Sequence, residues 1–391
     1  MDPRSALVIG VFAAFMSTHG YAATTLPADA AQDRAPEQEA LNPKGFYIDQ
    51  TGAVRRLHEP DRLGCKGFEI QAHRGYVTQP ENSLSAVVTA LSAKFNAAEV
   101  DVRRLRDGTW VLSHDGNTKR TMLNTTGKTS LRSMNLADWS QATMRNRDGT
   151  KSQETPVSLE QTLTDSLTVM SHGQTMNIEL KAKHGTCKSI GELNALTTGI
   201  LGDDRANYSS MNGTGPLVCV RKYNPSTYVA LIQGPSRKAL EKWAAATHGE
   251  ELSKLSGNKR LFAGAKIATE AFGGYQYPSW SSAAKLSELR RTLGNNVGLH
   301  VEITDLKADP SLVSRVRAAG VKLMSYTLTD NDSHIRDLLA LKSMGALPDG
   351  AILDSTPIKA CKMLGLEPWG LYPLAQFWIH PPSKPARCWD W

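Results

Sequence analysis

The chain is poor in several features that mark particular protein classes. Only 7% of its 391 residues are aromatic and 21% are charged, and its 45 Lys and Arg residues form no long basic run. With 38 acidic residues the net charge is +7, so nucleic acid is not an expected partner, whereas a small anionic substrate is compatible. Hydrophobic residues reach 40%, which excludes a disordered or fibrous protein and allows a full-sized core.

Cysteine is also scarce, and its spacing excludes two kinds of site. No Cys-x-x-Cys pair occurs, so a structural zinc site is not expected. None has a recognisable reactive setting, so thiol catalysis is not expected either. Five cysteines allow at most two disulfides with one thiol left over: Cys65, Cys187, Cys219, Cys361 and Cys388.

The first 22 residues have the pattern of a secretory signal peptide. A short polar start ending at Arg4 precedes an apolar stretch at 6–16, and small residues flank Tyr21. The apolar stretch is too short for a bilayer, which needs about 20 residues. We therefore expect a signal peptide at residues 1–22, cleavage after Ala22 and a secreted or periplasmic protein, in which disulfides can form.

The remaining chain predicts one α/β domain between two flanking segments. Residues 23–66 have no sustained apolar period and are expected to form an N-terminal leader. From residue 67 to 365, short apolar runs alternate with helical patterns such as the i, i+3, i+4, i+7 spacing from Leu84 to Leu91. This alternation predicts a parallel sheet, and eight units fit a (β/α)8 TIM barrel. The expected strands are 68–72, 98–102, 176–181, 217–221, 262–267, 298–303, 321–328 and 350–354.

Residues 366–391 form an aromatic C-terminal tail. Four of the eight tryptophans lie there, and prolines interrupt the segment, so it is not a membrane-spanning helix. We expect an apolar strap packed on the barrel. The alternative is an interfacial patch that reaches a membrane lipid surface.

Three acidic residues lie on two predicted strands. Glu99 and Asp101 are two residues apart, so both point to one face of their strand while Val100 points to the other. The same alternation places Glu179 beside Lys181 on the next predicted strand. Carboxylate oxygens suit Mg²⁺ or Ca²⁺ far better than Zn²⁺. The pattern predicts one divalent cation, Ca²⁺ or Mg²⁺, held by Glu99, Asp101 and Glu179; salt-bridged strand residues are the alternative.

Two histidines flank these acidic residues along the chain. His73 lies where the first predicted strand ends, next to Arg74, whose guanidinium can bind a phosphate through two hydrogen bonds. His114 follows a predicted hairpin at residues 109–113. Phosphodiester cleavage needs a base for the attacking oxygen and an acid for the leaving oxygen, and the two histidines can divide these roles.

In their order and spacing these residues resemble the glycerophosphodiester phosphodiesterase family over roughly residues 68–360. The most specific blocks are His73-Arg-Gly, Pro80-Glu-Asn, Glu99-x-Asp101, Asp107-Gly and His114-Asp115. Weaker matches follow at 156–160, 179–181, 320–327 and 349–357. The resemblance implies a TIM barrel, a cation held by Glu99, Asp101 and Glu179, catalytic residues His73 and His114, and a substrate phosphate bound by Arg74 and Lys181.

The chain departs from the family pattern at several places. Tyr326 stands where the family commonly has Trp, which affects the substrate pocket rather than the chemistry. Residues 116–150, which we call the insertion, are basic; they either cover the mouth of the barrel and steer anions or form a solvated loop. The segment 205–272 departs most, so the head group of the substrate is not readable.

We therefore expect a secreted, metal-dependent phosphodiesterase that cleaves glycerophosphodiesters to glycerol 3-phosphate and an alcohol. One alternative is a phospholipase D-type enzyme acting on lysophospholipid or sphingophospholipid, which only the aromatic tail supports. A non-catalytic binding barrel is disfavoured, because none of the expected residues is missing.

The expected barrel also predicts how the cysteines pair. Cys187 follows the third predicted strand and Cys219 lies in the fourth, so their loci are neighbours. Cys65 precedes the first strand, and Cys361 lies in the last helix of a closed barrel. We expect Cys187–Cys219, and Cys65 paired with either Cys361 or Cys388.

Overall fold

The structure is a computed structural model. It describes residues 63–236, apart from 125, 182–185 and 212, together with 279–328, 332–368, the strands 46–48 and 54–56, and several residues between 239 and 263. The predicted signal peptide at 1–22 lies outside the described residues. So do nearly all of the predicted C-terminal tail and most of the predicted leader. Within the unit 1–58, β1 (Phe46–Ile48) and β2 (Val54–Arg56) form an antiparallel hairpin.

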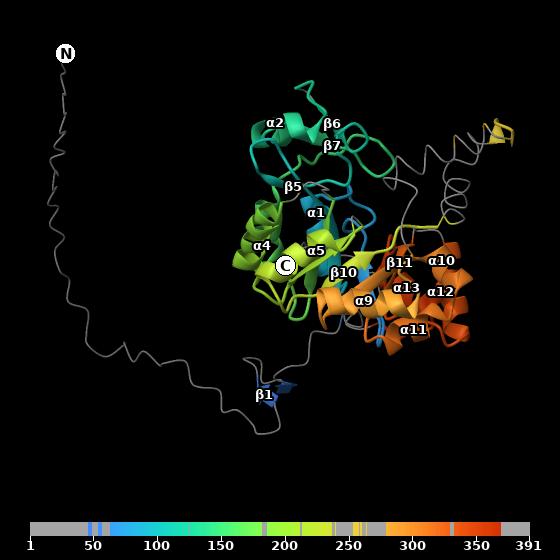
Figure 1. The fold of residues 1–391 in the computed structure, drawn as a ribbon. Coiled ribbons are helices and arrows are strands. Elements are labelled where there is room, and N and C mark those ends of the chain that lie inside the picture. Colours follow the sequence, from blue (N-terminus) through green and yellow to red (C-terminus); the bar gives the residue numbers. More distant parts are fainter. Residues whose placement is uncertain are drawn as a thin grey trace, which may run out of the picture. The chain divides into compact units, whose positions relative to one another are not determined.

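Eight parallel strands of the second unit close into a barrel, which confirms the predicted fold class (Figure 1). Pairing of the first strand with both the second and the last closes the sheet. In chain order the strands are β3 (Glu69–Ala72), β4 (Ala97–Arg104), β8 (Thr175–Leu180), β9 (Ala206–Ser210), β10 (Val229–Ile232), β11 (Val297–Glu302), β12 (Lys322–Leu328) and β13 (Gly350–Leu353).

Helices follow the strands and cover the outside of the barrel. Most begin at a Ser or Thr whose side chain accepts a hydrogen bond from the helix's first turn, as Ser83 does from Ala86 N. None of the described helices is long and apolar enough to cross a membrane. The helices are α1 (Leu84–Ser92), α3 (Leu159–Ser166), α4 (Cys187–Leu201), α5 (Gly215–Tyr223), α9 (Ala283–Leu293), α10 (Ile303–Ala308), α11 (Leu312–Ala318), α12 (Asp332–Ser343) and α13 (Pro357–Met363).

The two faces of the barrel strands have different side chains. Val100, Val102 and Ile178 belong to the large buried apolar core that the helices share. The interior carries buried polar side chains that bond to one another from different strands. Asn177 donates to Gln71 Oε1 at 2.7 Å and accepts from Ser209 Oγ at 2.9 Å. Because these groups satisfy one another, the interior can be polar without leaving them unpaired.

Six of the eight predicted strands agree with the structure within two residues at each end, but the fourth was predicted wrongly. Residues 217–221 lie in α5, and the fourth strand is β9. A short apolar run fits a strand or a buried helix equally well, and Pro216 in the first turn favours the helix. The strand predicted at 262–267 lies, apart from Ala263, outside the described residues, and β10 holds the fifth place in the barrel.

The insertion between β5 (Trp110–Leu112) and α3 folds into small elements with a core of their own, rather than a solvated loop (Figure 1). Trp139 and Met144 are almost fully buried in that core, beside Val111 of β5. β5 pairs antiparallel with β4, so the insertion is anchored next to the strand that carries Glu99 and Asp101. Its elements are β6 (Met122–Leu123), the 3-10 helix η1 (Leu131–Ser133), α2 (Leu136–Ser140) and β7 (Thr143–Met144).

Two disulfides occur in the described part of the chain, and both agree with the predicted pairings. Cys187–Cys219 joins the start of α4 to α5, so Cys219 lies in a helix and not in the predicted strand. Cys65 pairs with Cys361 of α13, which joins the segment before the first barrel strand to the last helix. Cys388, the other predicted partner of Cys65, lies outside the described residues.

Candidate active site

The carboxylates predicted to bind a cation meet near the carboxyl end of the barrel strands. Asp101 of β4 lies directly opposite Glu179 of β8 in the parallel register, and Glu99 precedes Asp101 on the same face. All three are buried, and one carboxylate oxygen from each lies within 4.8 Å of the others. In a (β/α)8 barrel this end of the strands forms the mouth, where active sites are found.

This acidic cluster fits a divalent cation. Glu99 Oε1 is buried without a hydrogen-bond partner, which is costly for an oxygen that carries negative charge. Burial, followed by the nearby Asp101 and Glu179, raises the pKa of Glu99 well above its usual value. Crowded hard oxygen ligands of this kind are what Ca²⁺ and Mg²⁺ bind. In the described part of the chain it is the only group of three or more potential ligands close enough to hold a metal.

The two predicted phosphate-binding residues lie against the same carboxylates. Arg74 Nε is 3.2 Å from Asp101 Oδ2, and Lys181 Nζ lies 3.1 Å from Asp101 Oδ1 and 2.6 Å from Glu179 Oε1. Burial by itself raises the pKa of Asp101, but Lys181 and Arg74 outweigh burial and hold it well below its usual range. The positively charged side chains of Arg74 and Lys181 therefore line the site next to the acidic cluster. Their binding of a phosphate stays a prediction.

The turn after β3 positions Arg74 by an uncommon backbone conformation. Arg74 and Asn82 have φ values of 55° and 57°, in the left-handed region that residues other than glycine rarely adopt. Arg74 N donates to Glu99 Oε2 at 2.8 Å. Asn82 bonds Asp101 twice, through Nδ2 to a carboxylate oxygen and through Oδ1 from the backbone N–H. These bonds balance the backbone strain, which is often found at functional sites.

His73 lies at the end of β3 and pairs with a carboxylate from the last strand of the barrel. Its Nδ1 is 3.1 Å from Asp354 Oδ2, and both side chains are about 15% exposed. Arg147 Nη1 donates to Asp354 Oδ1 at 2.8 Å. Asp354 is thus shared between a histidine and an arginine, and His73 and Arg147 contribute to holding the pKa of Asp354 below its usual value despite burial.

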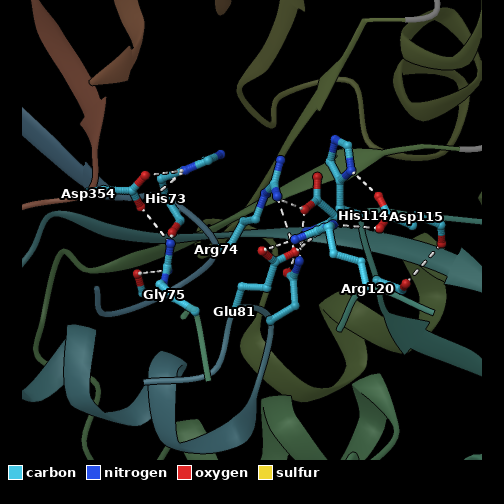
Figure 2. Close-up of polar contacts among 12 residues, drawn as sticks. His73, Arg74, Gly75, Glu81, His114, Asp115, Arg120 and Asp354 are labelled. Atoms are coloured by element: carbon cyan, nitrogen blue, oxygen red, sulfur yellow. Dashed lines mark hydrogen bonds and ion pairs between the residues drawn. The ribbon is translucent and has the colours of Figure 1, made fainter. Parts of the chain in front are cut away.

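His114 has the same kind of partner on the other side of the site. Its Nδ1 is 2.7 Å from Asp115 Oδ1, and Asp115 Oδ2 accepts from Arg120 Nε at 2.8 Å. Burial, followed by the positive charges of Arg74 and Lys181, lowers the pKa of His114 to about 4. Figure 2 shows His73 with Asp354 at one end of the row of side chains and His114 with Asp115 at the other, with Arg74 and Glu81 between them.

The structure thus brings together every residue predicted from the sequence, and it adds others that the sequence analysis gave no role, among them Asp354 and Arg147. Asp354 lies 281 residues from His73 and Arg147 lies 207 residues from Asp354, so no local spacing connects them. The only available signal was the weak similarity of residues 349–357 to the last block of the family pattern. For Arg147, inside the insertion, the sequence carried no signal.

Comparisons with known proteins agree with this geometry. The model of the glycerophosphoryl diester phosphodiesterase family matches residues 73–355. No curated protein sequence matches the chain.

Solved structures at low identity share the fold. An Oleispira antarctica phosphodiesterase in complex with the product sn-glycerol-3-phosphate is 19% identical, with a TM-score of 0.51 over 76% of this chain and 96% of that chain. A glycerophosphodiester phosphodiesterase from Parabacteroides distasonis is 17% identical, with a TM-score of 0.50 over 77% and 98%. One from Agrobacterium tumefaciens is 16% identical, with a TM-score of 0.50 over 75% and 99%.

Proposed function

The chain belongs to the glycerophosphoryl diester phosphodiesterase family, and from this premise we propose its reaction, its cofactor and the residues that act. It is a phosphodiesterase that hydrolyses glycerophosphodiesters to glycerol 3-phosphate and an alcohol. Glu99, Asp101 and Glu179 hold one divalent cation, Ca²⁺ or Mg²⁺. His73 and His114 are the general acid and base, and Arg74 with Lys181 binds the phosphate.

The observation that carries this proposal is the matched pairing of the two histidines around the acidic cluster. Each ring has its Nδ1 next to a carboxylate, Asp354 for His73 and Asp115 for His114. A carboxylate at Nδ1 favours the tautomer with the proton on that nitrogen, so Nε2 is the nitrogen that exchanges a proton with the substrate. Two such rings are what a displacement at phosphorus needs.

The residues around the site have different roles in the proposed reaction. Either water attacks phosphorus directly, or a hydroxyl of the substrate attacks first and water then opens the cyclic phosphate that forms. In each displacement one histidine removes the proton of the attacking oxygen, and the other protonates the leaving oxygen. His114, whose pKa is lowered to about 4, is neutral at pH 7 and able to accept a proton. Arg74 and Lys181 supply fixed positive charge to the phosphoryl oxygens. When bound, the cation adds Lewis-acid charge stabilisation to theirs.

We further propose that the protein works outside the cytoplasm, as a secreted or periplasmic enzyme. The two disulfides, Cys65–Cys361 and Cys187–Cys219, suit an oxidising compartment. The pattern at residues 1–22 agrees with export. The lipid-directed alternatives, a phospholipase D-type activity and contact with a membrane lipid surface, depend on the C-terminal tail, which lies outside the described residues apart from its start.

The cation and the histidines are tested separately on a panel of soluble glycerophosphodiesters, by measuring release of the alcohol. We expect EDTA to abolish turnover and added Ca²⁺ or Mg²⁺ to restore it. Since general acid–base terms are worth about 10²–10⁴-fold, His73→Ala and His114→Ala should each lose at least that much while still binding metal in calorimetric titration. Each carboxylate→Ala variant should instead lose both metal binding and activity.

One control variant and two contrary outcomes complete the test. His172 is exposed in the turn before β8, at the end of the barrel opposite the mouth, so His172→Ala should keep full activity. Full turnover in the presence of EDTA would exclude the proposed dependence on a divalent cation. A His73→Ala enzyme with more than about a tenth of wild-type turnover would exclude the catalytic assignment, given the expected 10²–10⁴-fold loss.

A further inference from the structure

The insertion contributes one arginine to each of the two histidine–carboxylate pairs. We propose that Arg147 and Arg120 are positioning residues that hold His73 and His114 through Asp354 and Asp115. This inference rests on the proposed function, because it gives the histidines their catalytic roles. It assigns to residues 116–150 a part in turnover that their sequence does not indicate.

Arg147 makes the more extensive set of contacts. Its Nη1 donates to Asp354 Oδ1 at 2.8 Å, and its Nη2 donates to the carbonyl oxygen of His73 at 2.9 Å. Its Nε donates to Gln79 O at 3.3 Å. One guanidinium therefore fixes the carboxylate that holds the His73 ring and the backbone that carries His73. A planar group with donors in a fixed fork can do this, whereas an ammonium cannot.

A short hairpin presents Arg147 to the site. Asn146 N donates to Thr150 O at 2.8 Å, and Gly149 N donates to Asn146 O at 2.8 Å, which closes a tight turn with Arg147 inside it. The turn follows β7, and Met144 of β7 is packed in the insertion's own core. The backbone that carries Arg147 is therefore positioned by the folded insertion, and the guanidinium reaches from there to the barrel.

Arg120 makes the equivalent link for His114. Its Nε donates to Asp115 Oδ2, and its Nη1 and Nη2 donate to the two oxygens of Glu81 at 2.6 and 2.7 Å. Glu81 in turn lies 3.1 Å from Arg74 Nη1. Arg120 thus connects the carboxylate behind His114 to the loop that carries Arg74, as Figure 2 shows.

Both links have the same chemical consequence. A carboxylate that accepts from an arginine has one oxygen fixed, so its other oxygen keeps a constant position for the histidine Nδ1–H. Each imidazole then has one tautomer and one ring orientation, with Nε2 directed to the reacting atoms. Groups that orient an acting side chain are typically worth about 10–100-fold in activity.

Alanine and lysine variants of the two arginines test the proposal. We expect Arg147→Ala and Arg120→Ala each to lose about 10–100-fold in kcat on a soluble glycerophosphodiester, with KM within about threefold of wild type. Added guanidinium ion at millimolar concentration should restore part of the kcat of the alanine variants, whereas methylammonium should not. Arg147→Lys should have a lower kcat than Arg147→Ala with added guanidinium, because an ammonium group lacks the planar fork of N–H donors.

Matched controls come from the same segments. The side chain of Arg145 donates to Gly149 O within its own hairpin, and Lys119 is exposed beside Arg120. Arg145→Ala and Lys119→Ala should retain wild-type kcat. If Arg147→Ala does not fold by circular dichroism, Asp354→Asn, which keeps the shape but removes the charge, replaces it and should lose kcat to a similar extent.

The outcomes separate this inference from the proposed function. Three results would each overturn the positioning role of the arginines. These are an unchanged kcat in the arginine variants, a loss of kcat/KM that comes only from a higher KM, and a loss of kcat that added guanidinium does not reverse. In those cases inactive His73→Ala and His114→Ala enzymes would leave the proposed function intact. Active histidine variants would instead remove the proposed function itself.

Discussion

At the scale of single residues, the charge of each group at the mouth depends on which neighbour it faces. Glu99 and Asp101 lie two residues apart on one strand, and both are buried. Burial with two nearby carboxylates raises the pKa of Glu99, whereas Lys181 and Arg74 overcome burial and lower the pKa of Asp101. The cluster thus combines a carboxylate whose ionisation is disfavoured with one whose ionisation is favoured, and a bound divalent cation would favour the ionised form of both.

Glu81 gives the clearest pH-dependent prediction. Burial alone raises its pKa, but Arg74 and Arg120 lower it from 4.5 to about 2. Because the folded-state pKa is depressed, the stabilisation is complete above the unfolded-state value and is lost as pH falls from about 4.5 to 2. A shift of this size corresponds to about 3 kcal/mol.

We expect Glu81→Gln to reduce the free energy of unfolding at pH 7 by up to about that amount. Between pH 5 and 2 the wild type should lose this advantage, so the stabilities of the two proteins should converge. Urea unfolding at several pH values measures the difference. A gap between the two proteins that stays constant down to pH 2 would contradict the assignment to Glu81.

At the scale of elements, the turn between β3 and α1 connects His73 and Arg74, the proposed catalytic and phosphate-binding residues, to the fold. Gly75 has a φ of 83°, and a Cβ at this position would lie 2.7 Å from the backbone carbon of Ala86 in α1. Its N–H donates to the carbonyl of Glu99 at 3.1 Å, so the turn is fixed to β4 as well. His73 and Arg74 are therefore held by a close approach that only glycine permits.

Gly75→Ala should consequently damage both stability and turnover. We expect a loss of folding free energy clearly larger than for Gly127→Ala, since Gly127 has a similar φ of 73° but a Cβ there would meet no atom within 4 Å. The turn must shift to relieve the contact, so kcat should fall only in Gly75→Ala. Thermal unfolding and steady-state kinetics of both variants give the comparison; equal losses would mean that the close approach does not matter.

At the scale of the whole molecule, the barrel is closed covalently as well as by hydrogen bonds. Cys65–Cys361 spans 296 residues and ties the segment before β3 to the helix after β13. Lys66 N also donates to Glu367 O at 2.9 Å near this disulfide. Cys187–Cys219 spans 32 residues and joins two neighbouring helices. The two bridges thus constrain very different lengths of unfolded chain.

The longer bridge should contribute more to stability. The chain-entropy relation gives about 6 kcal/mol for the Cys65–Cys361 loop and about 4 kcal/mol for the Cys187–Cys219 loop. We expect the Cys65→Ala/Cys361→Ala protein to unfold at lower denaturant than the Cys187→Ala/Cys219→Ala protein, with the active site retained in both. Denaturant unfolding under non-reducing conditions compares them, and the reverse order would show that local strain or packing dominates.

Much of this molecule follows from local patterns in its sequence. Alternation of apolar and polar residues places Glu99 and Asp101 on one face of a strand, because successive side chains on a strand point to opposite sides. Helical spacing of apolar residues predicted α1, and the turn residues Asp107 and Gly108 predicted the hairpin before His114. The pattern of short apolar runs predicted six of the eight barrel strands. It failed at residues 217–221, where a short apolar run does not distinguish a strand from a buried helix.

Only the tertiary structure determines the contacts that form when the barrel closes. His73 meets Asp354 because the first and last strands pair, and nothing local to either residue records that pairing. Arg147 reaches them because a folded insertion with its own core carries it there. Local sterics determine which face a side chain occupies, whereas closure of the sheet determines which distant side chains share that face. The sequence alone could therefore identify the acidic cluster and both histidines, but not the carboxylate and arginine that hold His73 in place.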